Sequence, residues 1–265
     1  VMSMNIINSA IKKGETLIDT AMTLNAMHPD LIVIRHQDSG ACNLLSQKVN
    51  CSVINAGDGR REHPTQALLD LLTIERELNR FDQNIDGMHI ALVGDLKYGR
   101  TVHSLSKLLC HYKNVKFSMV APDGLQMPTS ILDAVENAGH KIQLVNKMEG
   151  NLAADIVYQT RIQEERFPSQ EEANKYRGGF RISQSIYNAH CKPNSVLMHP
   201  LPRDSRLEAN ELDNDLNSND NLAIFRQVQN GVLIRMALFA LTLGVENKVE
   251  QYEVDVPWFS RKRDS

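Results

Sequence analysis

Cationic and amide side chains recur in this sequence where apolar runs give way to polar ones or where a helical pattern starts. Six residues stand in such places, namely Arg35, His63, Gln66, Arg100, Arg161 and Gln163. An arginine fork binds two oxygens of a carboxylate or phosphate at once, and a helix N-terminus favours anions. No nucleophilic serine or cysteine, carboxylate pair or metal-ligand cluster is evident beside them. The set favours a reaction between two anionic substrates, accelerated by orientation and charge neutralisation, without a metal or cofactor.

The stretch 55–70, NAGDGRREHPTQALLD, runs from an apolar strand through a polar turn into a helix. Two glycines interrupt the apolar run, and Pro64 suits the first helical turn because it lacks an N–H. Ligands of open α/β sheets bind at the carboxyl ends of strands, where His63 and Gln66 would lie. An ordinary polar turn with His63 as the helix cap explains this stretch equally well, so other stretches must decide.

Apolar runs and helical patterns alternate along the chain, which is typical of βαβ units and parallel sheets. We predict a buried strand at 31–36 and further strands at 51–55, 89–94, 116–121, 141–145, 154–158, 196–203 and 222–226. Helices are predicted at 14–24, 40–49, from 64 onwards, after 99, at 129–138 and at 231–243. We therefore expect an α/β fold with two domains, each a parallel sheet flanked by helices.

The composition indicates a globular chain. Of 265 residues, 42% are hydrophobic and 23% are charged, and the net charge of -3 comes without the basic stripe of a nucleic-acid binder. The four cysteines, Cys42, Cys51, Cys110 and Cys191, are too far apart for a Cys-x-x-Cys motif, so we expect reduced thiols. No apolar run is long enough to span a bilayer, and the first ten residues do not resemble a signal peptide. A cytoplasmic location without a membrane partner is the expectation.

The turn that follows the run at 89–94 has two possible interpretations. Its pattern, Gly-x-x-x-x-Gly-Arg-Thr at 94–101, differs from a P-loop at the lysine, where Arg100 stands. No later strand ends in an aspartate that would bind magnesium, which weakens that interpretation. Arg100 at a helix N-terminus instead suits a carboxylate or phosphate ligand, or is simply solvated.

Four motifs together resemble the catalytic chain of the aspartate carbamoyltransferases. They are HPTQ at 63–66, GDLKYGRTVHS at 94–104, TRIQ at 160–163 and HPLPR at 199–203. The resemblance runs from about Ser9 to Leu243 in the order of that family. It implies the aspartate/ornithine carbamoyltransferase fold and transfer of the carbamoyl group from carbamoyl phosphate to the amine of L-aspartate. The products would be N-carbamoyl-L-aspartate and phosphate, in pyrimidine biosynthesis.

The resemblance also implies a role for each matching residue. Carbamoyl phosphate would be bound by Arg35, His63, Gln66, Ser9, Lys13 and Pro200. Aspartate would be bound by Lys13, Arg100, Arg161, Gln163 and Leu201. His63 would donate to the carbonyl oxygen and act in catalysis with Arg35 and Lys13. Pro200 and Leu201 would offer backbone carbonyls to the reacting amines, and the departing phosphate would take the amine proton.

Domain boundaries follow from the same resemblance. Residues 1–64 would form part of a carbamoyl-phosphate domain on which a helix at 230–246 packs back, residues 65–229 an aspartate-binding domain, and 247–265 a tail. The Ser-x-Arg-Thr phosphate loop of the family has no counterpart in residues 1–60. We therefore expect the first domain to be incomplete and the chain on its own to have little activity.

Partners are implied by one loop of the family. Ser9 and Lys13 match a loop that reaches into the site of a neighbouring subunit, which implies a homotrimer with shared sites. Whether a regulatory chain binds is left open. Two alternatives remain: an ornithine or other amino-acid carbamoyltransferase, which shares HPTQ but carries a cysteine in the loop at 199–203, and a non-catalytic chain that keeps the fold.

Overall fold

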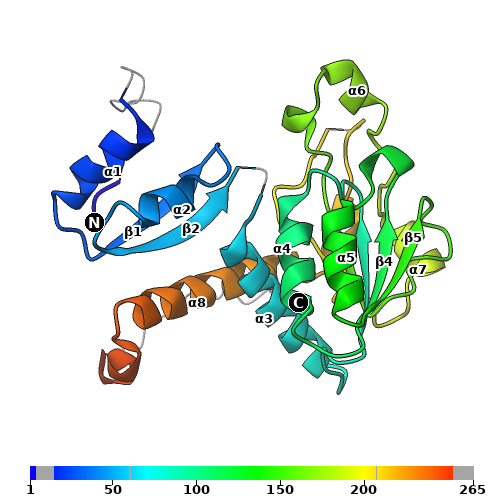
Figure 1. The fold of residues 1–265 in the computed structure, drawn as a ribbon. Helices are drawn as coiled ribbons and strands as arrows, with labels where there is room; N and C mark the ends of the chain where they lie inside the picture. Colours follow the sequence, from blue (N-terminus) through cyan, green and yellow to red (C-terminus); the bar gives the residue numbers. More distant parts are fainter. Residues whose placement is uncertain (4–14, 60, 207, 253–265) are drawn as a thin grey trace.

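Two parallel sheets and the helices around them make up the computed structural model, which describes residues 1–3, 15–59, 61–206 and 208–252 (Figure 1). The strands are β1 (Leu31–His36), β2 (Ser52–Asp58), β3 (His89–Val93), β4 (Lys116–Val120), β5 (Lys141–Val145), β6 (Ile156–Gln159) and β7 (Val196–Met198). The α-helices are α1 (Leu17–Asn25), α2 (Ala41–Ser46), α3 (Pro64–Asn79), α4 (Arg100–Leu109), α5 (Thr129–Asn137), α6 (Gln170–Asn174), α7 (Gln184–His190) and α8 (Ile224–Thr242). Short 3-10 turns lie at Asp123–Leu125, Glu164–Arg166, Asn214–Ser218 and Glu246–Tyr252. The predicted α/β fold with two parallel sheets is confirmed.

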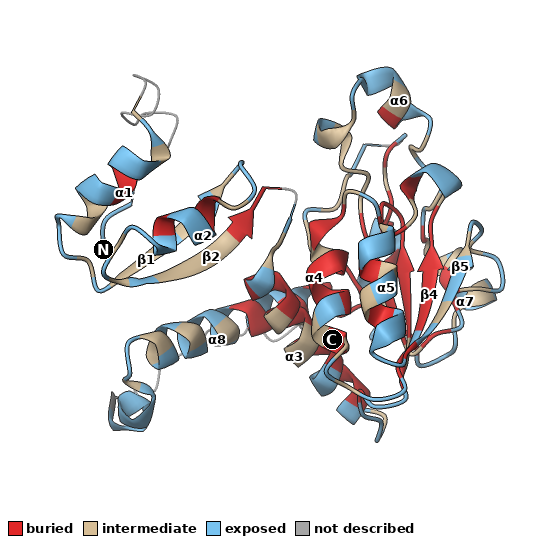
Figure 2. Ribbon diagram, in the orientation of Figure 1, coloured by how far each residue is buried: buried red, intermediate tan, exposed pale blue. Residues whose placement is uncertain are grey.

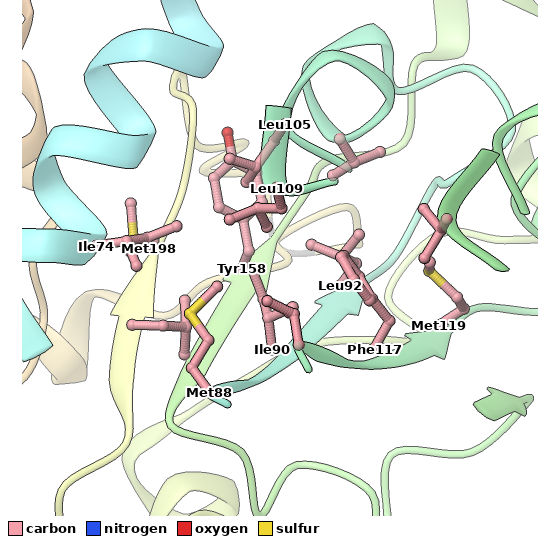
Figure 3. Close-up of a cluster of buried hydrophobic side chains, with 14 of the residues drawn as sticks. Ile74, Met88, Ile90, Leu92, Leu105, Leu109, Phe117, Met119, Tyr158 and Met198 are labelled. Carbon is pink, nitrogen blue, oxygen red and sulfur yellow. The ribbon is translucent and has the colours of Figure 1, made fainter. Parts of the chain in front are cut away.

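The larger sheet has the strand order β5-β4-β3-β6-β7, and every neighbouring pair is parallel. Its central strands are buried on both faces, which explains their continuous apolar runs (Figure 2). Because side chains alternate along a strand, Ile90 and Leu92 of β3 join one apolar cluster, with Phe117 and Leu105 (Figure 3), while Ala91 joins a second cluster on the other face. This core holds the carboxyl ends of β3, β6 and β7 at one edge.

The smaller sheet pairs β1 with β2 in parallel. Ala41, Cys42 and Leu45 of α2 are buried, but β1 is half exposed, and Val33 has 50% of its surface in solvent. The prediction of a buried strand at 31–36 is therefore wrong for burial although right in its bounds. In a two-stranded sheet each strand has a neighbour on one side only, so less of its surface is covered.

Helices α3 and α8 pack against one another, and α8 then extends below the smaller sheet in the view of Figure 1. Asn230 Nδ2 of α8 donates to Thr73 Oγ1 of α3 at 2.9 Å, and Arg226 pairs with the buried Glu77. Buried residues of α8 lie in its first half. The predicted domain boundary between 64 and 65 coincides with the start of α3, and the division into domains stays a prediction.

Two predicted strands differ from the structure. The segment 222–226 makes only an isolated bridge at Leu222 and then becomes the first turns of α8, because Gln227 and Asn230 turn their amides toward α3. The stretch 196–203, predicted as a strand that its two prolines terminate, is strand only as far as Met198, because Pro200 and Pro202 cannot donate to a ladder.

All four cysteines lie in described segments and are free thiols. None of the helices in the described residues is both long enough and apolar enough to span a bilayer.

Candidate active site

A cleft with a volume of about 300 Å³ opens where the two sheets face each other. It is lined by Arg35, His63, Gln66, Gly99, Arg100, Thr101, Arg161, Gln163, Glu165, Arg166, His199, Pro200, Leu201, Pro202 and Arg235. Eight of the ten residues predicted for the site are in this lining. The other two, Ser9 and Lys13, lie outside the described residues. The lining comes from the end of β1, the starts of α3 and α4, the segments after β6 and β7, and the middle of α8.

His63 stands at the N-terminal end of α3. Its backbone N donates to Ser104 Oγ of α4 at 3.0 Å, and its side chain makes no capping hydrogen bond. His63 is thus the N-cap residue of α3 by position, and its ring, whose Nδ1 lies 3.4 Å from Thr65 Oγ1, lines the cleft. Burial, followed by repulsion from the nearby Arg100 and Arg35, lowers the pKa of His63 to about 4. The ring is neutral at pH 7 and has one N–H to donate into the cleft.

Arg100 connects the stretch 55–70 with the start of α4. Its Nη1 donates to the carbonyl oxygen of Gly59 at 2.8 Å, and its side chain lies against Gly57. Burial, followed by repulsion from Arg166 and Arg35, lowers the pKa of Arg100 to about 10, so the guanidinium stays charged at pH 7. The approach of a guanidinium to within van der Waals distance explains the glycine at position 57.

The turn after β3 and the segment after β6 are joined by one buried carboxylate. Asp95 accepts hydrogen bonds from the backbone N–H of Tyr98 at 2.9 Å and of Gln163 at 3.0 Å. Burial raises the pKa of Asp95, and these backbone N–H groups oppose the rise without cancelling it. Thr160 Oγ1 adds a bond to the Val93 carbonyl at 3.0 Å. These hydrogen bonds join the segment of GDLKYGRT to that of TRIQ, and they hold the backbone that carries Arg161 and Gln163 in place.

Arg161 is held by an ion pair within its own turn. Its Nη2 and Nη1 donate to the two carboxylate oxygens of Glu165 at 2.7 and 3.1 Å. Burial raises the pKa of Glu165, but the hydrogen bond from Arg161, a backbone hydrogen bond and the charges of Arg161 and Arg166 together leave that pKa lowered. The guanidinium fork is thereby fixed at the cleft, and 28% of its side chain is open to solvent. A guanidinium has five N–H donors, so those that Glu165 and the Ile162 carbonyl do not use are left for a second carboxylate.

The loop after β7 is stabilised by a hydrogen bond to the side chain of His199, which is buried. His199 Nδ1 accepts from the Leu201 backbone N–H at 2.9 Å, and its Nε2 lies 2.9 Å from Glu211 Oε1, outside hydrogen-bonding angles. Leu201 has a φ of 57°, in the left-handed region that a branched residue enters only when its surroundings impose it. This loop contributes Pro200 and Leu201 to the lining of the cleft.

Sequence reasoning missed four charged or hydroxyl residues of the lining: Arg235, Arg166, Glu165 and Thr101. Thr101 lies inside the motif at 94–104, whereas Glu165 and Arg166 follow TRIQ closely and could have been found by extending that motif. Arg235 lies in the apolar pattern of α8 and reaches the cleft because that helix runs back along α3. No feature of the local sequence indicates this packing.

The charges of the lining determine what the cleft holds. Five arginines face a single carboxylate residue, Glu165, so the cleft attracts anions. In the described residues no group of three histidine, cysteine or acidic side chains is arranged to hold a metal ion. The lining also offers N–H donors from His63 and the amides. Such a site can bind two anions, donate to a carbonyl oxygen and stabilise negative charge as it develops.

Two family models match the chain: the carbamoyl-P binding domain of aspartate/ornithine carbamoyltransferase over residues 1–76 and the Asp/Orn binding domain over residues 86–242. The chain belongs to the aspartate/ornithine carbamoyltransferase family. The catalytic subunit of aspartate carbamoyltransferase from Cellvibrio japonicus is 54% identical over 257 residues, which cover 97% of this chain and 76% of that protein. The family and the fold predicted from the four motifs are thus confirmed.

Solved structures of this family have the same fold. Aspartate transcarbamoylase from Trypanosoma cruzi, in complex with carbamoyl phosphate and aspartate, has a TM-score of 0.80 at 37% identity and covers 90% of this chain and 74% of its own. The catalytic subunit from M. jannaschii has a TM-score of 0.77 at 37% identity and covers 94% of this chain and 77% of its own.

Proposed function

We propose that this chain transfers the carbamoyl group of carbamoyl phosphate to the amine of L-aspartate. The observation that carries the proposal is the cleft itself, where arginines from two strand ends, one 3-10 turn and two helices meet around one space of about 300 Å³. Two anionic substrates need such a surplus of cations. The relatives with this fold are named as aspartate carbamoyltransferases, which supports aspartate rather than ornithine as the acceptor.

Carbamoyl phosphate is assigned to the side of the cleft formed by the smaller sheet and α3. Arg35 would bind the phosphate, with Ser9 and Lys13 added by the resemblance. His63 would donate its N–H to the carbonyl oxygen, which is supported by its neutral ring and lack of a capping bond. Gln66 and the Pro200 carbonyl would bind the amide end.

Aspartate is assigned to the side formed by the larger sheet. Arg161, fixed by Glu165, would bind one carboxylate, and the buried Arg100 would bind the other, with Gln163 beside them. The Leu201 carbonyl would accept from the aspartate amine. The amine would thereby be aimed at the carbonyl carbon of the first substrate, which is the arrangement that direct transfer needs.

The reaction then runs without a covalent intermediate on the protein. The aspartate amine forms a bond to the carbonyl carbon while negative charge grows on the carbonyl oxygen, where the His63 N–H stabilises it. The bond from that carbon to the phosphate oxygen breaks, and the phosphate takes the proton that the amine gives up. The products are N-carbamoyl-L-aspartate and phosphate, and the chain supplies orientation and charge.

A transfer assay tests this function. The purified protein is given carbamoyl phosphate labelled at carbon together with aspartate or ornithine, and the products are separated by charge. We expect labelled N-carbamoyl-L-aspartate and no labelled citrulline. Citrulline as the main product would replace aspartate by ornithine, and binding of both substrates without any product would favour a non-catalytic chain.

Gly57→Ala is expected to weaken aspartate use through Arg100. A Cβ at Gly57 would lie 2.9 Å from Arg100 Nη2, and the φ of 131° is one that alanine rarely adopts. We expect the free energy of unfolding to fall by about 1–3 kcal/mol and the KM for aspartate to rise at least about tenfold.

The matched control is Gly87→Ala, since Gly87 also has a left-handed φ, of 83°, but no atom lies within 4 Å of its Cβ position. It should lower stability similarly without changing the KM for aspartate. Equal KM values in both variants would remove Arg100 from the aspartate site.

We also propose a cytoplasmic homotrimer with sites shared between subunits, in which residues 1–64 and the α8 end bind carbamoyl phosphate and 65–229 bind aspartate. The free thiols of the four cysteines support a reducing compartment. A regulatory chain is compatible with this assembly. The proposal for sharing depends on Ser9 and Lys13, which the resemblance assigns to the site of the neighbouring subunit.

Mixing Lys13→Ala and Arg100→Ala chains should restore part of the activity that each lacks alone. In mixed trimers some sites would combine an intact Lys13 from one subunit with an intact Arg100 from the next. Activity is measured after gentle dissociation and reassociation, with mixed trimers verified by mass. If mixed trimers form and stay inactive, the sites are not shared.

A further inference from the structure

Asp70 of α3 lies one helical turn beyond Gln66 and is completely buried. Three side chains donate to it: Gln66 Nε2 at 2.8 Å and Gln227 Nε2 at 2.5 Å to Oδ1, and the Tyr158 hydroxyl at 2.6 Å to Oδ2. Burial raises the pKa of Asp70 to about 7, and the three hydrogen bonds oppose this rise. A carboxyl group is costly to bury, so its presence behind the cleft needs an explanation.

The first consequence of these contacts is a fixed orientation of the Gln66 amide. In its ionised form Asp70 only accepts hydrogen bonds, and the Gln66 amide accordingly turns its NH2 toward it. Its carbonyl oxygen is then the group left for the cleft, which Gln66 lines. Without Asp70 the amide could rotate and present NH2 instead.

The second consequence reaches the loop after β7. Gln227 of α8 also gives its NH2 to Asp70, which leaves its Oε1 to accept the His199 backbone N–H at 3.1 Å. His199 is the residue that holds Leu201 through its ring. One carboxylate therefore fixes two amides, that of Gln66 in the cleft and that of Gln227, which holds the loop that contributes Pro200 and Leu201 to the lining.

We propose that Asp70 is a positioning residue that keeps hydrogen-bond acceptors facing the acyl end of the first substrate. The cleft would then select a carbamoyl group, whose NH2 can donate, over an acetyl group, which has a methyl in the same place. A site built to bind an N–H rejects an analogue that lacks it, because the acceptor is left unpaired. The inference rests on the proposed function.

The test compares the Kd of carbamoyl phosphate with that of acetyl phosphate by calorimetry, in the wild-type protein and in Asp70→Asn. Asparagine has the same shape, but its own NH2 cannot accept, so one of the donors must turn away. We expect the ratio of the Kd of acetyl phosphate to the Kd of carbamoyl phosphate to fall at least about tenfold in Asp70→Asn. The KM for aspartate should change less than this ratio, because Arg161 and Gln163 are outside the network and only Leu201 is linked to it.

Thr73→Val is the matched control. Thr73 lies on the same helix and is equally buried, and its Oγ1 accepts from Asn230 at 2.9 Å across the same helix pair. It should lose stability without a change in the ratio. If Asp70→Asn does not fold, Gln227→Met takes its place and should lower the ratio at least about threefold through the loop.

Each outcome has one meaning. A wild-type protein that binds neither acyl phosphate contradicts the proposed function itself. A selective wild type whose ratio survives Asp70→Asn, or Gln227→Met where that replaces it, overturns the role of Asp70. A ratio that falls as far in Thr73→Val also overturns that role, because general loosening of α3 would then explain the effect.

Discussion

Arg161→Ala is expected to lower kcat/KM for aspartate by about 100-fold or more, corresponding to about 3 kcal/mol of lost transition-state binding. The guanidinium fork is the group that Glu165 fixes at the cleft, and its removal would leave a substrate carboxylate without its partner. Binding of carbamoyl phosphate, measured separately by calorimetry, should change by less than about threefold because Arg161 is on the other side of the cleft.

Two variants separate charge from geometry at this position. Arg161→Lys keeps the charge but loses the fork, and should recover only a small part of the activity. Glu165→Gln keeps Arg161 but loosens its anchor, so we expect a higher KM for aspartate with a smaller change in kcat. Loss of carbamoyl phosphate binding with normal aspartate use in Arg161→Ala would reverse the assignment of the two sides.

His63→Ala is expected to reduce kcat by about 100- to 1,000-fold, the usual cost of losing one donor to a developing oxyanion. The reason is the N–H that the neutral ring offers, with no capping bond to occupy it. Stopped-flow or steady-state kinetics with both substrates saturating would measure this, and His63→Asn, which keeps a donor, should retain more activity. An unchanged kcat in His63→Ala would mean that a group other than His63 donates to the carbonyl oxygen.

The pKa of His63 adds a pH dependence that can be measured without substrate. The ordinary value is 6.5 and the folded value is about 4, so between these pH values the unfolded chain binds the proton and the folded chain does not. Stability due to this residue is complete above pH 6.5 and is lost as the pH falls toward 4. Compared with His63→Ala, the wild type should lose an extra 1 to 2 kcal/mol, roughly, between pH 7 and pH 5 in urea unfolding. If the free energy of unfolding changes with pH in the same way in both proteins, the pKa of His63 is not lowered by folding.

The sequence predicted those parts of the site that depend on local signals. His63 and Gln66 follow a glycine turn and a proline at a helix start, Arg100 begins α4, and Arg161 follows β6, so each could be placed at a strand or helix end. The order of the βαβ units then brings these ends to one edge, as parallel sheets require. The eight described residues met in one cleft for this reason.

The parts that failed depend on packing between segments distant in sequence. Arg235 and Asp70 lie inside helices and acquire their positions only where α8 crosses α3, which periodicity does not show. Residues 222–226 have a strand-like apolar composition, but the amides of Gln227 and Asn230 pair with α3 and extend the helix instead. The exposure of Val33 likewise reflects how few strands flank β1.

Calorimetric titration of a bisubstrate mimic that joins a phosphonate to an aspartyl group tests most directly whether one cleft holds both substrates. The two halves are titrated separately in the same protein. We predict one site per chain and a Kd at least about 100-fold below that of either half, because joining the halves removes the cost of bringing them together. In Arg161→Ala the mimic should bind no more tightly than its phosphonate half. A mimic that binds no more tightly than its phosphonate half would contradict a shared cleft for the two substrates.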